Sequence, residues 1–337
     1  RLGMDIDTLA LMAISGFLNS PLAANLPSQP PSSNIAHSQN EEEVSSRHFS
    51  VEPPSVTFEG LWDDIRVDDI DFDLISPNGK VTSEDDYILW GQFNRFLPIK
   101  FSLRMLAHSM QNTVNQHGES LLPLEKWFSD IRRSAASVRR HLSEIDLTQN
   151  IPRGEQLASG FPTINEKSLD RFVNHFCANI YSDGTVVGFP SHLGLIKATP
   201  DCRYVSLTEA GLDYVQLHNP VLDGSSPFTS SMSEQESTFM IEQIKSHLPS
   251  TWAFMCFILE SINNGKCTPN QLSEEIDSVY GITPSHNMGS SKGWNAAQIS
   301  TYRTGAIGLL GDMHLIERRR EGRRVAYSLS QTGKDQI

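Results

Sequence analysis

Five arginines lie within seven positions near the end of the chain, in the stretch LIERRREGRRVAYSLSQTG, namely Arg318, Arg319, Arg320, Arg323 and Arg324. A Glu-Gly pair in the middle of the run is typical of a tight turn, so we expect a two-stranded hairpin. Alternation along a strand places Arg318 and Arg320 on one face and Arg319 on the other. Guanidinium groups on such a hairpin suit the phosphates or the minor groove of a DNA duplex. The alternative is an exposed hairpin whose arginines pair with Glu317, Glu321 or acidic residues near the amino terminus.

A second group of arginines lies on a predicted helix over residues 124–145, namely Arg132, Arg133, Arg139 and Arg140. At about 100° per residue the four fall on one side of this helix, next to its apolar stripe and clear of it. The functional interpretation is contact with phosphates along a duplex. The alternative is a solvated face with ion pairs to Asp130, Glu144 or the acidic segment.

A third candidate surface lies on the predicted helix 295–313, whose apolar stripe comprises Ile299, Tyr302, Ala306, Leu309 and Leu310. The surface that faces away from this stripe is small and polar, with Ala297, Thr301, Thr304 and Gly308 facing out and Gln298 and Ser300 at its edges. Gln, Ser and Thr side chains can contact base edges or phosphates. Arg303 adds the only charge and sits beside the stripe. The same small residues would also permit close packing against another protein helix.

Two segments 120 residues apart are alike: LIKATPDCRYVSLTEAG (195–211) and LIERRREGRRVAYSLSQTG (315–333). Each begins Leu-Ile, crosses a polar turn, resumes with a short β-type run and ends Ser-Leu-Thr/Ser-x-x-Gly. Helices precede both, at 101–118, 124–145 and 165–180 before the first segment and at 250–264, 268–279 and 295–313 before the second. The pattern indicates two copies of one supersecondary unit.

At these residues the chain resembles the winged helix-turn-helix superfamily, particularly its MarR-like and PadR-like members. Their usual ending is a helix, Leu-Ile or Leu-Val, an Arg-rich hairpin, a strand and Leu-Thr-x-x-Gly. The resemblance implies that helix 295–313 is a recognition helix and that 315–329 is its wing. The first copy is a looser match, because its wing carries only Lys197 and Arg203 against Asp201.

The fold class that we expect is therefore mainly α with small β-wings, as tandem winged-helix domains preceded by an acidic, partly extended N-terminal region. Five segments follow from the composition: an amphipathic helical arm (1–20), a flexible Pro/Ser/Glu-rich linker (21–56), an acidic segment with a short strand (57–96), a first winged-helix-like domain (97–224) and a second winged-helix domain (225–337).

The net charge of −13 belongs mainly to the N-terminal third, since residues 1–100 carry 16 acidic and 6 basic side chains. Four cysteines without a C-x-x-C pair favour reduced thiols in a cytoplasmic protein. The apolar run Leu9–Leu18 is too short to cross a bilayer, so no membrane is expected. Alternating Asp69, Asp71 and Asp73 do not fit a calcium loop, because Leu74 and Lys80 occupy the required Gly and Glu positions.

The sequence predicts a non-enzymatic protein that binds double-stranded DNA and recruits or regulates a DNA-associated process such as transcription. No metal, cofactor or small-molecule ligand is implied, since no tetrahedral ligand set, phosphate-binding loop or hydrolase motif is present. The alternative is a winged-helix adaptor subunit of a larger multiprotein machine that binds protein rather than DNA. In either case the N-terminal region could serve a protein partner or self-association. A nuclease is a third interpretation.

Overall fold

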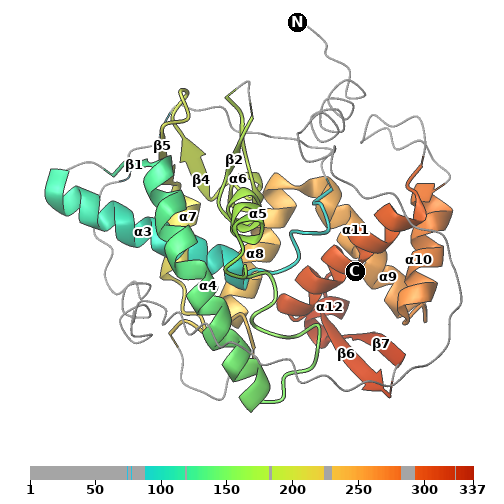
Figure 1. Ribbon diagram of the computed structural model, residues 1–337. Helices are drawn as coiled ribbons and strands as arrows, with labels where there is room; N and C mark the ends of the chain where they lie inside the picture. Colours follow the sequence, from blue (N-terminus) through green and yellow to red (C-terminus); the bar gives the residue numbers. More distant parts are fainter. Residues whose placement is uncertain are drawn as a thin grey trace, which may run out of the picture.

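The computed structural model describes residues 74, 77, 88–117, 120–181, 184–223, 230–281, 293–322 and 324–337. The predicted arm, the linker, most of the acidic segment with its short strand, and Arg323 lie outside these residues. The described part is mainly helical, with small antiparallel sheets (Figure 1). We refer to residues 88–223 as the first half and to residues 230–337 as the second half.

The first half contains α3 (Leu97–His117), β1 (Leu122–Pro123), α4 (Leu124–Thr148), α5 (Glu166–Phe176), β2 (Asn179–Ile180), β3 (Val186–Val187), α6 (Phe189–His192), β4 (Ile196–Ala198), β5 (Tyr204–Leu207) and α7 (Glu209–Gln216). Strand β5 lies between β1 and β4 in an antiparallel sheet, and β2 pairs with β3. The helix predicted over 165–180 ends at Phe176, because the residues after it turn away to form the β2–β3 hairpin.

The second half contains α8 (Glu234–His247), α9 (Pro249–Asn263), α10 (Pro269–Ile276), a π-helical turn η2 (Asp277–Gly281), α11 (Ala296–Asp312), β6 (Ile316–Glu321), β7 (Arg324–Leu329) and α12 (Gln331–Lys334). Strands β6 and β7 form an antiparallel pair. Tyr327 N on β7 also donates to Cys267 O at 2.8 Å, just before α10. Cys267 therefore occupies the same place beside β7 that β1 occupies beside β5 in the first half.

Local sequence signals explain where the helices of the second half begin. The Thr268 side chain accepts a hydrogen bond from Gln271 N, and the Gln271 side chain accepts one from Thr268 N. Pro269 occupies the first turn of the helix. Asn295 and Gln298 form the same reciprocal cap at the start of α11. Such caps satisfy backbone N–H groups that have no partner within the helix.

The internal repeat has the same backbone geometry in both halves. Gly194 (φ 66°) and His314 (φ 58°) adopt the left-handed conformation that turns the chain from a helix into a strand. Leu195 N and Leu315 N, each one residue later, close the preceding helical turn with hydrogen bonds of 2.9 Å. The two Leu-Ile sequences therefore occupy equivalent positions.

The ends of the repeat also correspond atom for atom. The side chains of Thr208 and Ser330 accept from Gly211 N (3.0 Å) and Gly333 N (2.9 Å). Each glycine lies against the backbone of the leucine that precedes the first strand, Leu195 or Leu315. A Cβ on either glycine would lie 2.0 Å from the carbonyl oxygen of that leucine, so no larger residue fits there. The Ser-Leu-Thr/Ser-x-x-Gly motif thus encodes one cap, used twice.

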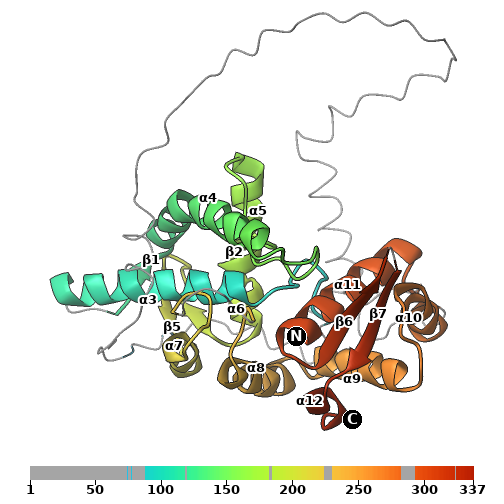
Figure 2. The same cartoon turned by 90° about the horizontal axis from the view of Figure 1, so that it is seen from below.

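Buried polar contacts join the two halves. Lys100 Nζ on α3 lies 3.0 Å from Glu236 Oε1 on α8, and both side chains are fully buried. Phe96 N, just before α3, donates to Asp312 Oδ2 at the end of α11 at 3.0 Å. Figure 2 shows the second half lying beside the N-terminal end of α3, where these contacts occur. Polar groups in such surroundings are satisfied only while the halves remain together.

Candidate nucleic-acid interface

The predicted hairpin is present as β6 and β7, and its register confirms the predicted alternation. Arg318 lies opposite Tyr327 and Arg320 opposite Val325, whereas Arg319 lies opposite Ala326. Arg318 and Arg320 therefore share one face of the hairpin, the inner face. Arg319 and, by alternation along β7, Arg324 share the outer face.

The inner face of the hairpin is turned toward the first half. The Arg318 guanidinium lies 5.7 Å from the centre of the Tyr327 ring and packs against Gly154 in the loop after α4. Arg320 Nη2 donates to the carbonyl oxygen of Arg153 in the same loop. These two arginines thus contact the protein's own backbone.

The outer face carries two exposed arginines, and Arg320 of the inner face is exposed as well. Arg319 Nη2 lies 3.4 Å from Glu317 Oε2, but both side chains are more than half exposed, so this pair contributes little. Arg324 is exposed and makes no ion pair with any residue that the structure describes. The pairing of arginines with Glu317 that the alternative predicted occurs here for one of them.

Helix α11 buries the predicted apolar stripe and exposes only part of its outer surface. Ala297, Ser300 and Thr304 are exposed, and the Thr301 and Thr304 hydroxyls donate to carbonyl oxygens of their own helix at 2.8 and 2.7 Å. Arg303 Nη1 donates to Pro269 O at 2.8 Å and to the Ser273 hydroxyl. Arg303 therefore fixes α10 against α11 rather than facing a ligand.

The remaining outer surface of α11 is covered by the segment before α3. A Cβ on Gly305 would lie 2.4 Å from Gly91 Cα, and one on Gly308 would lie 2.5 Å from Asn94 O. A Cβ on Gly91 would in turn lie 2.0 Å from Thr301 O. The small residues of α11 thus serve close packing, but against a non-helical segment of the same chain rather than against the protein helix that the alternative interpretation expected. With residues 91–94 in place, this part of α11 is closed to a major groove.

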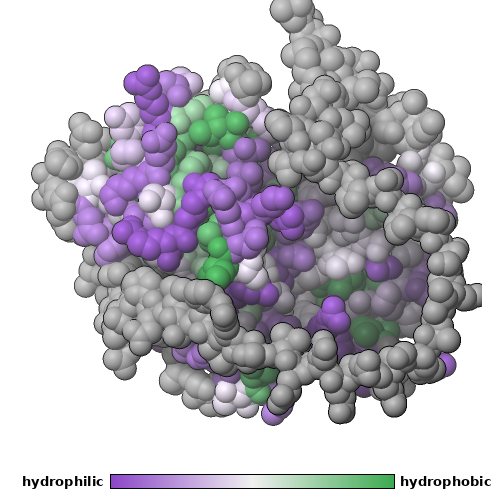
Figure 3. Space-filling model, viewed as in Figure 1, coloured by the Kyte–Doolittle hydropathy of each residue, from purple (hydrophilic) through white to green (hydrophobic). Residues whose placement is uncertain are grey.

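Three of the four arginines on α4 also contact the protein itself. Arg132 pairs with Asp170 of α5 at 2.6 Å, and Arg133 pairs with Asp130, one of the predicted partners. Arg139 Nη1 donates to Ala158 O (3.3 Å) and to Phe161 O. Arg140 is exposed and forms no hydrogen bond or ion pair with a described residue. Figure 3 shows hydrophilic side chains gathered over α4 and α5.

The first half offers no exposed helix at the position equivalent to the end of α11. That position is α6, a single turn whose four residues are all buried. Its wing carries Arg203 paired with Asp201 at 3.6 Å, and this pair is largely exposed. The weak match of the first copy in the sequence therefore reflects a shortened helix and a wing with little net charge.

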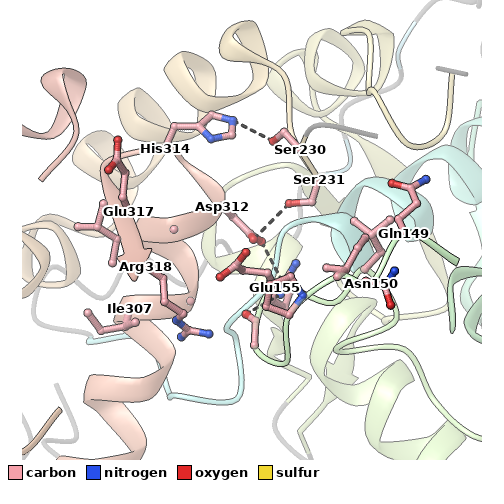
Figure 4. Close-up of a pocket in the computed structure, with 18 residues that line it drawn as sticks. Gln149, Asn150, Glu155, Ser230, Ser231, Ile307, Asp312, His314, Glu317 and Arg318 are labelled. Carbon is pink, nitrogen blue, oxygen red and sulfur yellow. Dashed lines mark hydrogen bonds and ion pairs between the residues drawn. The ribbon is translucent and has the colours of Figure 1, made fainter. Parts of the chain in front are cut away.

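A cavity of about 410 Å³ lies between the halves, and nothing in the sequence indicated it. The loop after α4, the end of α11 and the start of β6 enclose it, as Figure 4 shows. The Asp146 carboxylate anchors this loop by accepting from Leu157 N (2.7 Å) and Ala158 N (3.0 Å). The sequence signals for the loop are Pro152 and Gly154, which predict a turn but not its partners.

The described ranges contain no group of three or more His, Cys, Asp or Glu residues arranged to hold a metal ion. None of the helices in these ranges combines the length and apolar character needed to cross a bilayer. No protein-family model, no curated protein and no solved structure matches the chain.

Proposed function

We propose that this chain is a non-enzymatic adaptor built from two winged-helix units, which binds protein rather than DNA as part of a larger assembly. The order of elements supports the winged-helix assignment. Each half has the same order of elements: first a helix, then a segment that pairs with the last strand, then further helices and finally two antiparallel strands. In each half the last strand also lies in the middle, β5 between β1 and β4 and β7 between Cys267 and β6.

The observation that carries the proposal is the packing of residues 91–94 onto α11. A winged helix that reads base edges needs the outer surface of this helix free to enter the major groove. Here Gly305 and Gly308 face the backbone of Gly91 and Asn94. Arg320 and Arg139 are likewise engaged with the chain's own carbonyl groups, and Arg318 packs against Gly154. Part of the surface that contacts DNA in such proteins is used here for internal packing.

Charge distribution agrees with a protein partner. Residues 1–87 contain 16 of the 40 acidic residues but only 4 of the 27 basic ones, so residues 88–337 are close to neutral. A nearly neutral body attracts DNA weakly, because non-specific affinity depends on counterion release by clustered cations. The cysteines Cys177, Cys202, Cys256 and Cys267 form no disulfide, which suits the cytoplasmic location that we expect.

The test is purification of the tagged full chain from its source cells, with and without nuclease treatment. We expect a protein partner in a fixed molar ratio that nuclease does not change, and no saturable binding of a 30-base-pair duplex by the isolated chain at about 0.15 M salt. Recovery only through DNA, or tight duplex binding with a steep salt dependence, would overturn the adaptor proposal.

A second candidate function is contact with DNA phosphates through the outer face of the wing. The exposed guanidinium groups of Arg319 and Arg324 favour it. In a fluorescence anisotropy titration, alanine at both positions should then weaken duplex binding and reduce the salt slope by about 2. The matched control is alanine at Arg318 and Arg320 on the inner face. An unchanged affinity in the outer-face variant removes this function.

A further inference from the structure

Three arginines, Arg95, Arg318 and Arg320, converge on two consecutive loop residues, Arg153 and Gly154, beside the cavity between the halves. Arg95 Nη1 lies 3.4 Å from Gly154 O, and Arg320 donates to the carbonyl oxygen of Arg153, whose own side chain is exposed. A Cβ on Gly154 would lie 1.8 Å from Arg318 Nη1, so this guanidinium rests directly on the glycine. Arg95, Gly154 and Arg318 all line the cavity.

Carboxylates near the cavity do not balance this charge. Asp312 is paired with Arg95 at 3.2 Å and also accepts from Phe96 N and the Ser231 hydroxyl. Glu317 also lines the cavity, but its carboxylate pairs with Arg319 at 3.4 Å. Glu155 lines the cavity but forms no ion pair with a described residue. Within the described ranges, Arg318 and Arg320 therefore have no carboxylate partner.

Some of the guanidinium donors in the cavity wall also lack a hydrogen-bond acceptor. Arg95 is 5% exposed, and its Nε lies 3.2 Å from the Asp312 carboxylate in an ion pair but forms no hydrogen bond. Arg318 is half-buried and donates no hydrogen bond to any residue in the described part of the chain. Each guanidinium has five N–H donors, and leaving them unsatisfied in a partly dry site is costly. An acceptor-rich anion would satisfy both groups.

We propose that this cavity binds a small phosphate-bearing ligand, with Arg318 and Arg95 as its principal donors and with Arg320, bound to the carbonyl oxygen beside Gly154, adding positive charge nearby. A phosphate group supplies up to two negative charges and several acceptor oxygens, and it matches the guanidinium fork. The volume of about 410 Å³ falls within the range of small-molecule sites. A duplex backbone does not fit, because Arg95 is buried. The ligand would bridge the first-half loop and β6, and its binding does not depend on the adaptor proposal.

The test is isothermal titration of the full chain with inorganic pyrophosphate, compared with sodium chloride at the same ionic strength. We expect saturable binding that Arg318→Gln weakens at least about tenfold, the effect of losing a charged hydrogen bond. Arg319→Gln is the matched control, because it removes the same charge from the next residue but on the outer face. Its affinity should stay within about twofold of the parent, since exposed charges are screened.

Glu155→Gln provides a second measurement that does not remove a donor. Taking an unpaired carboxylate from the cavity wall should tighten pyrophosphate binding severalfold, and circular dichroism should show an unchanged fold. Absence of saturable binding overturns the proposal. So does an equal loss in Arg318→Gln and Arg319→Gln, or binding of a duplex that pyrophosphate does not displace. If Arg318→Gln fails to fold, Arg320→Gln and Glu155→Gln decide, because unchanged affinity in both would also refute the site.

Discussion

The buried ion pair between Lys100 and Glu236 makes a quantitative prediction about the joint between the halves. Both side chains are fully buried, and Nζ and Oε1 are 3.0 Å apart. Burial lowers the pKa of Lys100 from 10.5 to about 8, an effect that the Glu236 carboxylate opposes. Glu236→Gln removes this carboxylate while keeping the shape of the side chain. The lysine must then either stay charged without its partner or release its proton.

The cost of releasing the proton limits the stability loss. Each pH unit below the folded pKa of about 8 makes deprotonation of Lys100 costlier by about 1.4 kcal/mol. The upper bound on the loss in Glu236→Gln is therefore about 1 kcal/mol at pH 7 and about 3 kcal/mol at pH 6. Above the folded pKa the lysine of the parent protein is itself neutral, so the loss at pH 9 should be close to zero.

Urea denaturation followed by circular dichroism at pH 6, 7 and 9 measures these losses as shifts of the midpoint at constant m. The control is Glu242→Gln on the same helix, since Glu242 pairs with Lys245 at 3.0 Å but is largely exposed. Its effect should stay below about 0.5 kcal/mol at every pH. A loss in Glu236→Gln that is the same at pH 6 and pH 9 would refute the reasoning.

Four further predictions concern stability. Burial lowers the pKa of His192 from 6.5 to about 4, so the folded state loses about 2 kcal/mol relative to the unfolded state as pH falls from 7 to 5, measurable by urea unfolding and reduced in His192→Gln. Gly333→Ala should destabilise by about 2 kcal/mol or more in thermal melts, because its Cβ would meet a carbonyl oxygen at 2.0 Å. Gly311→Ala, with nothing within 4 Å of the added carbon, should instead stabilise by up to about 1 kcal/mol. Arg303→Met should cost about 1–3 kcal/mol by losing its bonds to α10, with no change in duplex binding by anisotropy.

Elements with local signals could be predicted from the sequence. The Thr268 and Asn295 caps place the starts of α10 and α11, and a left-handed Gly322 (φ 62°) closes the turn of the wing. The repeat was visible because its cap, its close-approach glycine and its Leu-Ile start each depend on residue type at a fixed spacing. Caps, turns and close-approach glycines depend on residues that are near one another in the sequence, so the sequence alone indicates them.

The contacts of Arg320 and Arg132 could not be predicted, because their partners are distant in the chain. Arg320 binds a carbonyl oxygen 167 residues earlier, and any residue type could supply that atom. Arg132 pairs with Asp170, whereas the sequence suggested only acidic residues nearby in the helix or in the N-terminal third. The covering of α11 by Gly91 and Asn94 has the same origin, since small residues permit close approach without specifying what approaches.

The position of Glu236 also bears on how the chain is inherited. The sequence boundary at 224/225 assigns α8 to the second half, yet its carboxylate neutralises Lys100 in the first. If the gene were divided at that point, each of the two encoded fragments would keep one charged side chain of this pair without its partner. Exchange of either half between related genes is thus disfavoured. The two halves should be inherited together, and they should unfold together in one cooperative thermal transition.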